Sequence, residues 1–290
     1  MKKNTSSCKL QLKTKRYFAG RIFALLLLFC LSPFSRVFYS MAVMSIYSKI
    51  NEKNSLLHSE EIKLSVPGGL STLRSDWYPF VMTFEANSGF RHFTGDSSLD
   101  LTILYNFPAF SPTKGCSRLY DTASPYYNSF YGAYLVKDAD GGTYGFTKQS
   151  DGTLYPDVAA VAEVPKYDFW QLVLSEFGLT RANAVFDWNI TEISGPVSYA
   201  GEDGFYRMDA TLTVNGSSHE YDGFTQSYLQ YGKPNFPVTN PLAAVPMHGR
   251  LYGKYLEDKQ VSLFFYIVAA DKNVLEECDR EILSESELNY

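Results

Sequence analysis

The pattern of apolar and polar positions predicts a strand-rich chain after residue 60. Residues 62–66 alternate apolar and polar side chains and stop at Pro67, a combination typical of a short strand. Residues 261–270 form a continuous apolar run of ten, which is too short to cross a membrane and indicates a central buried strand. Residues 99–105 give the clearest strand of the first half. Further strands are predicted at 77–84, 184–193, 205–214 and 219–228.

Helical patterns are fewer. Asp168 is a predicted N-cap for a helix over 169–177, where apolar residues recur at helical spacing before Gly178. A last helix is predicted over 273–283, with Leu275, Cys278 and Ile282 on its apolar face and acidic residues on the face toward water.

Turn residues predict how the strands connect. Asp138 to Gly142 separates two short β patterns and predicts a hairpin, as does the Asn215-Gly216 pair. Residues 231–249 contain four prolines and predict a long surface loop. We therefore predict an α+β fold, with an antiparallel sheet and few helices, over residues 62–290. One domain and two halves, 62–150 and 151–290, both fit the length.

The N-terminus has a different pattern. An apolar run at 22–31 follows seven Lys and Arg residues and no acidic residue. Residues 22–46 therefore predict one N-terminal apolar helix, which acts either as an uncleaved signal anchor or as a signal peptide cleaved before Val43. We favour the anchor, because the small residues at 40–42 lie far from the apolar run.

The positive-inside rule then predicts a basic cytoplasmic segment at 1–21, a linker at 47–61 and an extracytoplasmic domain at 62–290. The predicted location is the cell membrane, with a single pass and the C-terminal domain outside. The alternative is secretion after cleavage.

The net charge of −5 hides an asymmetry between these parts. Residues 1–40 carry eight Lys and Arg and no acid, whereas residues 41–290 carry the other 18 and all 31 Asp and Glu, a net charge of −13. An acidic body repels phosphate backbones, so we expect no nucleic-acid partner. The expected partners are the membrane, through residues 22–46, and an envelope polymer or protein.

One short string carries candidate chemistry. Gly115-Cys116-Ser117-Arg118 resembles the Gly-Cys-x-Arg core of L,D-transpeptidases, in which a thiolate attacks a peptide carbonyl of the cell wall. The resemblance covers only these residues, and Lys114 occupies the position where that family has His. It implies Cys116 as nucleophile with Arg118 beside it, and His92 is a candidate base. The other interpretation of Cys116 is a buried thiol or a disulfide with Cys278.

Other motifs indicate no cofactor or metal. The Asp138–Gly142 segment lacks the ligands of a calcium loop, and the His and Cys spacings match no zinc site. Six tyrosines crowd residues 105–134, where they favour either core packing or recognition of sugars and peptides. Two hypotheses remain: a membrane-tethered, non-catalytic binding module, and a cell-wall cysteine enzyme that uses Cys116.

Overall fold

The computed structural model describes residues 21, 22, 24, 28, 30, 33–72, 74–111, 116–170, 179, 184–221, 224–227 and 242–290. The chain divides into two compact units, Met1–Met44 and Ser45–Tyr290. Helix α2 (Pro33–Glu52) begins in the first unit and ends in the second. Among the helices of the described residues, none is both long enough and apolar enough to cross a membrane.

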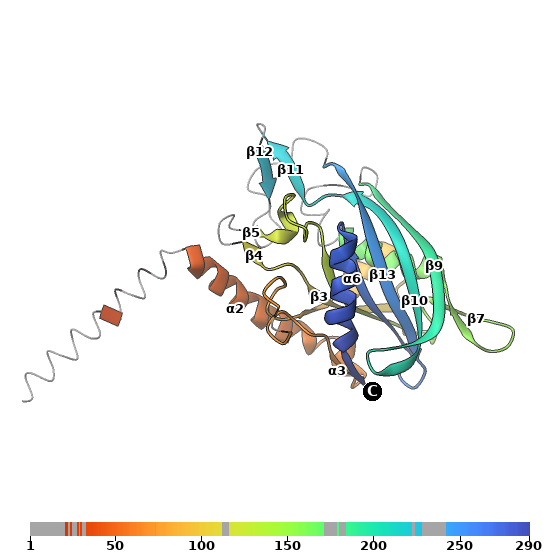
Figure 1. Ribbon diagram of the computed structural model, residues 1–290. Helices are drawn as coiled ribbons and strands as arrows, with labels where there is room; N and C mark the ends of the chain where they lie inside the picture. The colour runs from red at the N-terminus through yellow and green to blue at the C-terminus, as the bar shows by residue number, and fades with distance from the viewer. Residues whose placement is uncertain are drawn as a thin grey trace, which may run out of the picture. The chain divides into compact units, whose positions relative to one another are not determined.

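A seven-stranded antiparallel sheet forms the centre of the second unit (Figure 1). In spatial order its strands are β2 (Met82–Glu85), β3 (Leu99–Asn106), β6 (Phe130–Asp138), β14 (Val261–Ala269), β13 (Ala244–Leu256), β10 (Glu202–Asn215) and β9 (Phe186–Tyr199). Strand β14 lies in the middle of the sheet and every one of its residues is buried, which confirms the prediction from its continuous apolar run. The fold is α+β with a large antiparallel sheet and few helices, as predicted.

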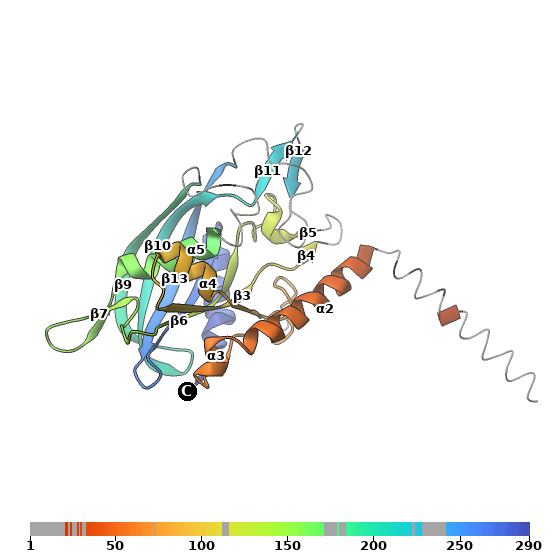
Figure 2. The ribbon, with the colours of Figure 1, turned by 180° about the vertical axis from the view of Figure 1, so that it is seen from behind.

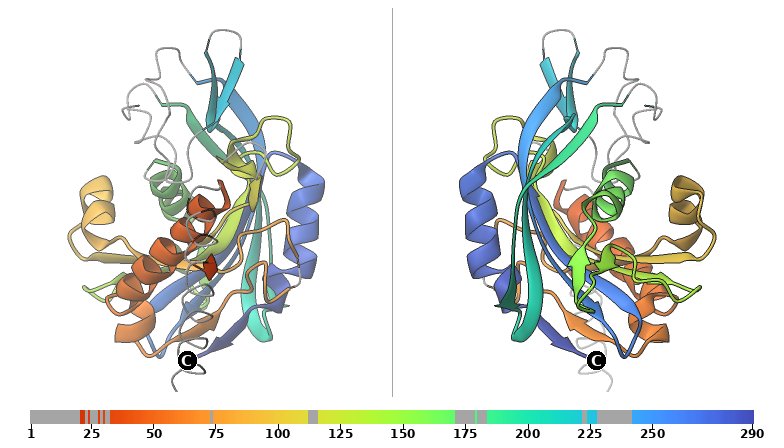
Figure 3. Two further views of the ribbon diagram at one scale, coloured as in Figure 1. Left: turned by 90° about the vertical axis from the view of Figure 1, so that its left-hand side faces the viewer. Right: turned by 90° about the vertical axis from the view of Figure 1, so that its right-hand side faces the viewer.

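Helices pack on both faces of this sheet (Figure 3). One face carries α6 (Lys272–Glu281), and the other carries α4 (Asn87–Thr94) and α5 (Val158–Phe169). Because side chains alternate along a strand, Phe265 of β14 joins the core beneath α6, while Tyr266 lies on the opposite face. There the ring of Phe130 contacts both Tyr266 and Phe169 of α5.

Short elements complete the unit. They are α3 (Leu56–Ser59), the two-stranded ribbons β1 (Lys63–Ser65) with β15 (Glu287–Asn289), β4 (Phe110–Ser111) with β5 (Cys116–Ser117), β7 (Phe146–Lys148) with β8 (Leu154–Pro156) and β11 (Ser218–Tyr221) with β12 (Phe224–Ser227), and the 3₁₀ turns η1 (Arg118–Tyr120) and η4 (Leu283–Glu285).

Residues 47–61, predicted as a linker, form the end of α2 and the turn of α3. Ser55 and Leu56 are buried, and the backbone N–H of Leu56 donates to Thr102 Oγ1 at 2.9 Å. Two of the polar residues that indicated a linker also contact the sheet, because Asn51 accepts from the N–H of Glu85 and Glu60 pairs with Lys137.

Helix α5 corrects the predicted helix. It begins after Asp157, whose Oδ1 accepts hydrogen bonds from the N–H groups of Ala159 and Ala160. Asp168 is not an N-cap: it lies in the last turn of α5 and is fully buried. The alanines at the start of α5 are strong helix formers, so the helix begins eleven residues earlier than predicted. Residues 171–178 of the predicted helix lie outside the described residues.

Two predicted hairpins are not formed. Strand β6 pairs with β3 and β14, while the residues after the Asp138 turn form β7 and pair with β8. Strand β10 ends at Asn215 and pairs with β9 and β13, while β11 pairs with β12. Both edges of β6 and of β10 are already occupied by other strands of the large sheet, so the residues after the two turn signals pair elsewhere.

The predicted loop at 231–249 is also shorter than expected, because β13 begins at Ala244 and Pro246 lies opposite Thr213. Residues 228–241 lie outside the described residues. Because β6 of the first half pairs with β14 of the second, the two predicted halves share one sheet.

Candidate ligand-binding groove

A groove of about 820 Å³ lies where α2 ends, between α3 and the β1–β15 ribbon. A second cavity of about 550 Å³ adjoins it and shares Lys49, Glu52, Leu57, Leu64 and Ser65 with its lining. The shared residues place the two cavities side by side along the end of α2, and the two together are called the groove. Its combined size is that of a site for a small or medium-sized ligand.

Hydrogen bonds to an edge strand hold α2 in place beside this groove. Strand β2 pairs only with β3, so its outer edge exposes alternate N–H groups. Ser48 Oγ accepts a hydrogen bond from the N–H of Thr83 at 2.8 Å, and Asn51 Oδ1 accepts one from the N–H of Glu85 at 3.1 Å. Side chains three residues apart on the helix thus satisfy donors two residues apart on the strand.

The end of the groove nearer Ser45 has an apolar lining. It is formed by the turn after Pro67 and by residues 79–83, and it includes Val66, Leu70, Phe80 and Val81. The turn packs so closely on the second segment that a Cβ on Gly68 would lie 2.7 Å from Phe80 Cα. Only glycine fits at this position.

The other end has a charged lining. It contains Lys49, Lys53, Lys63 and His58, together with Glu52 and Glu287. Within the part of the chain that the structure describes, none of these three lysines makes an ion pair. Apolar side chains thus line both ends of the groove, and the charged side chains are concentrated at one of them.

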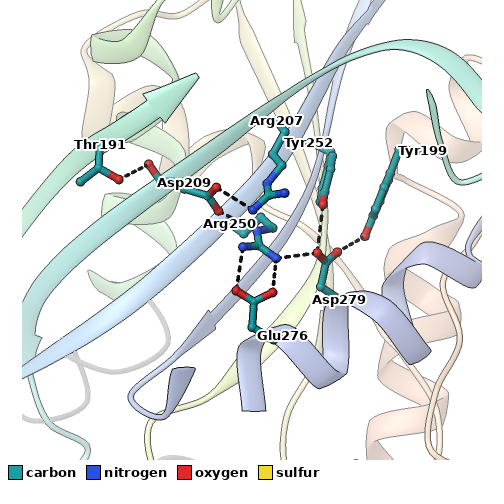
Figure 4. Close-up of polar contacts among 8 residues, drawn as sticks. All are labelled: Thr191, Tyr199, Arg207, Asp209, Arg250, Tyr252, Glu276 and Asp279. Carbon is teal, nitrogen blue, oxygen red and sulfur yellow. Dashed lines mark hydrogen bonds and ion pairs between the residues drawn. The ribbon is translucent and has the colours of Figure 1, made fainter. Parts of the chain in front are cut away.

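The most prominent ionic cluster lies elsewhere, where α6 meets β10 and β13 (Figure 4). Arg250 is its centre, with a side chain only 6% exposed. The Arg250 guanidinium donates to Asp209 Oδ1 at 2.6 Å, to Glu276 Oε2 at 2.8 Å and to Asp279 Oδ2 at 2.8 Å. The hydroxyls of Tyr199 and Tyr252, whose rings stack, donate to the same Asp279 carboxylate at 2.7 and 2.9 Å.

The cluster has the electrostatics of a structural network. Burial disfavours the charged guanidinium of Arg250, but its hydrogen bonds to the three carboxylates outweigh this and raise the pKa of Arg250. The hydrogen bond from Arg250 lowers the pKa of Glu276. Burial, together with the charge of Asp279, raises the pKa of Tyr199. The guanidinium, the three carboxylates and the two tyrosine hydroxyls pair with one another, and these contacts hold α6 against the sheet.

A second buried polar group lies on the opposite face. Asp168 accepts a 2.6 Å hydrogen bond from the hydroxyl of Tyr134, whose ring stacks on Tyr266. Its other oxygen, Oδ1, is buried and has no hydrogen-bond partner among the described residues. Burial raises the pKa of Asp168 to about 7, although the hydrogen bonds from Tyr134 and Tyr266 oppose the shift.

The structure does not bring the predicted cysteine-enzyme residues together. His92 is exposed on α4, which precedes the Leu99 end of β3, whereas Cys116 and Arg118 follow the Asn106 end. An eight-residue strand is about 25 Å long, and Figure 2 shows α4 and β5 well apart. Arg118 is instead paired with Asp76 at 2.9 Å.

The thiol and tyrosine predictions have separate outcomes. Cys278 is a free, buried thiol on α6, so the disulfide with Cys116 is not formed. Tyr105, Tyr120, Tyr131 and Tyr134 are buried, which favours the core-packing interpretation of the tyrosine-rich segment.

Sequence reasoning missed both the Arg250 cluster and the groove. A signal for the first existed: Asp209 lies between Met208 and Ala210, and Arg250 lies between Gly249 and Leu251, so each charge is directly flanked by uncharged residues. Asp279, expected to face water, is buried within this cluster. The groove had no such signal, because its lysines come from three separate segments.

In the described part of the chain, no group of three or more His, Cys, Asp or Glu residues could hold a metal ion. Comparison with protein-family models, with curated proteins and with solved structures finds no match to this chain.

Proposed function

We propose that the protein is a membrane-tethered, extracytoplasmic binding module, whose ligand occupies the groove between α2, α3 and the β1–β15 ribbon. Residues 22–46 act as the tether, and the domain after residue 47 lies outside the membrane. The groove is the observation that carries the proposal.

The geometry of the groove supports binding. It is open, it holds a volume typical of ligand sites, and the segments around it are fixed by hydrogen bonds rather than by the ligand. The two buried clusters described above, around Arg250 and Asp168, are in contrast used for packing. Asp279 and Glu276 hold Arg250, and Asp168 holds Tyr134.

The charge distribution supports the tether. Seven cations and no acid precede the apolar run at 22–31. Moving those cations outward across a membrane costs about 2.3 kcal/mol per charge for each 100 mV of potential. Residues 1–21 therefore stay in the cytoplasm and the domain is exported.

Cysteine labelling of intact cells tests the topology. The background replaces Cys8, Cys30 and Cys116 by Ser and keeps the buried Cys278. Ser150→Cys lies in the exposed turn between β7 and β8, and Ser7→Cys lies in the basic segment. We expect a membrane-impermeant maleimide to label position 150 on intact cells and position 7 only after lysis.

Labelling of position 150 only after lysis would overturn the proposed topology. A secreted domain is distinguished by fractionation: the alternative with a cleaved signal predicts that position 150 is found in the medium on a chain that lacks residues 1–42.

A further inference from the structure

We propose that the groove binds an anionic amphiphile, that is, an acyl chain with an acidic head group. This inference rests on the proposed binding function and names the class of its ligand. The occupant follows from a groove that has apolar lining throughout and most of its charged side chains at one end.

The apolar end matches a hydrocarbon chain. Val66, Leu70, Phe80 and Val81 line it, and Leu70 is 72% exposed. Exposed apolar surface of this kind gains free energy when a ligand removes it from water, by about 25 cal/mol for each Å². A sugar or a polar peptide would bury less of this apolar surface against apolar atoms and so gain less free energy.

The charged end matches an acidic head group. Lys49, Lys53 and Lys63 converge from α2, the turn after it and β1, and they outnumber the two carboxylates, Glu52 and Glu287, of the same lining. The local excess of positive charge stands out in a body whose net charge is −13. A carboxylate or phosphate forms ion pairs with these lysine ammonium groups, whereas the same ammonium groups would repel a cationic head group.

The two ends are joined in the right order. Lys49 and Leu64 line both cavities, so a head group held at Lys49 lies beside the cavity that Val81 lines. The helix sets which end of the groove is which. Ser45, on α2, lines only the apolar end, and Lys53, directly after α2, lines only the charged end. One extended amphiphile can therefore satisfy both ends together.

Photo-crosslinking with the full chain in phosphatidylcholine nanodiscs tests this assignment. The probe is a long-chain fatty acid that carries a diazirine near the end of its chain. We expect crosslinks at residues 62–83, identified by mass spectrometry after proteolysis. A photoactivatable phosphatidic acid serves as the phospholipid arm, and the fatty alcohol of the same length serves as the neutral arm.

The variants separate head-group binding from folding. Lys49→Glu with Lys63→Glu should reduce crosslinking by about tenfold, because it reverses two charges at the head-group end. Lys148→Glu, at an exposed lysine of β7 outside the groove, should leave it unchanged. Ser65→Trp, at an exposed position that lines both cavities, should block the groove by its bulk while the far-ultraviolet circular dichroism spectrum stays the same.

Preferential labelling by either acid supports the proposal and shows which source of the acidic head the groove accepts. Equal labelling by the alcohol, crosslinks confined to residues 22–46, or no effect of Ser65→Trp would overturn it. The crosslinking result does not depend on the orientation of the protein in cells. If the topology test fails and the groove is still labelled, the proposed topology is overturned and the ligand class stands. If the topology test succeeds and the groove is not labelled, only the ligand class is overturned.

Discussion

The hydroxyl oxygen of Ser48, on α2, accepts a 2.8 Å hydrogen bond from the backbone N–H of Thr83, on the edge strand β2. Both residues are buried. An edge strand has unpaired backbone N–H groups, which can pair with a strand of another molecule. Here a helix of the same chain occupies that edge. The contact makes the end of α2, after Ser45, a structural part of the domain.

Replacing Ser48 by Ala should therefore destabilise the domain. The N–H of Thr83 would remain buried without an acceptor, which costs about 1–3 kcal/mol of unfolding free energy. Urea denaturation of the full chain, followed by tryptophan fluorescence, measures the loss. The matched control is Ser59→Ala, at an exposed hydroxyl of α3, and equal midpoints for the two variants would contradict the role of Ser48.

Asp168 predicts a pH dependence of stability. Its pKa is about 7 in the folded domain, against 3.8 for an ordinary aspartate. The folded state therefore binds the proton more tightly, and the stabilisation is complete below pH 4 and lost as the pH rises to 7. The total loss is about 4 kcal/mol for a shift of this size.

Asp168→Asn should remove this component, because an amide keeps an acceptor for Tyr134 and does not titrate. The difference in unfolding free energy between the parent and the variant, measured from pH 4 to pH 8, isolates it from other groups. A constant difference across that range would show that Asp168 is not the titrating group.

The buried cluster around Arg250 predicts a large loss of unfolding free energy when one of its charged members is removed. Arg250→Met would leave Asp279 buried without its cation, a change that typically costs 3–5 kcal/mol. The control is Arg280→Met on the same helix, where the side chain is 70% exposed and paired only with Glu281. Chemical denaturation should show a much lower midpoint for Arg250→Met and little change for Arg280→Met; similar midpoints would refute the structural role of the cluster.

The burial of Cys278 predicts that its thiol is protected from modification in the folded domain. Burial, with a smaller contribution from the charge of Asp279, raises its pKa well above normal, so the reactive thiolate is scarce. In the background that lacks Cys8, Cys30 and Cys116, a water-soluble maleimide should label Cys278 only in urea. Adding Ser59→Cys gives a positive control that labels without urea, and equal native rates at the two positions would show that Cys278 is accessible.

The sequence predicted the parts of the fold that depend on local patterns. The apolar run of β14 and the apolar face of α6 at Leu275 and Cys278 are confirmed, because each signal lies within one element. Strand pairing was not predictable in the same way. The Asn215-Gly216 signal suggested a local hairpin, whereas β10 gains its burial from β9 and β13.

The groove shows the same limit more strongly. Lys49 and Lys63 carry no pattern in common, and Glu287 lies more than two hundred residues away from both. Only the pairing of β1 with β15 brings them to one site. Single-element periodicity cannot detect a site that is assembled by the meeting of distant segments.

The β1–β15 ribbon also joins the groove to the core. Glu287, Leu288 and Asn289 form one wall of the groove and pair with β1 rather than with the seven-stranded sheet. Leu64 and Leu288, which lie opposite each other in the ribbon, both pack against the hydrophobic core. A stop codon after Ser286 would leave the pairings of the large sheet in place but remove both that wall and the packing of Leu288. Trimming by a carboxypeptidase would likewise act on the groove and on this edge of the core together.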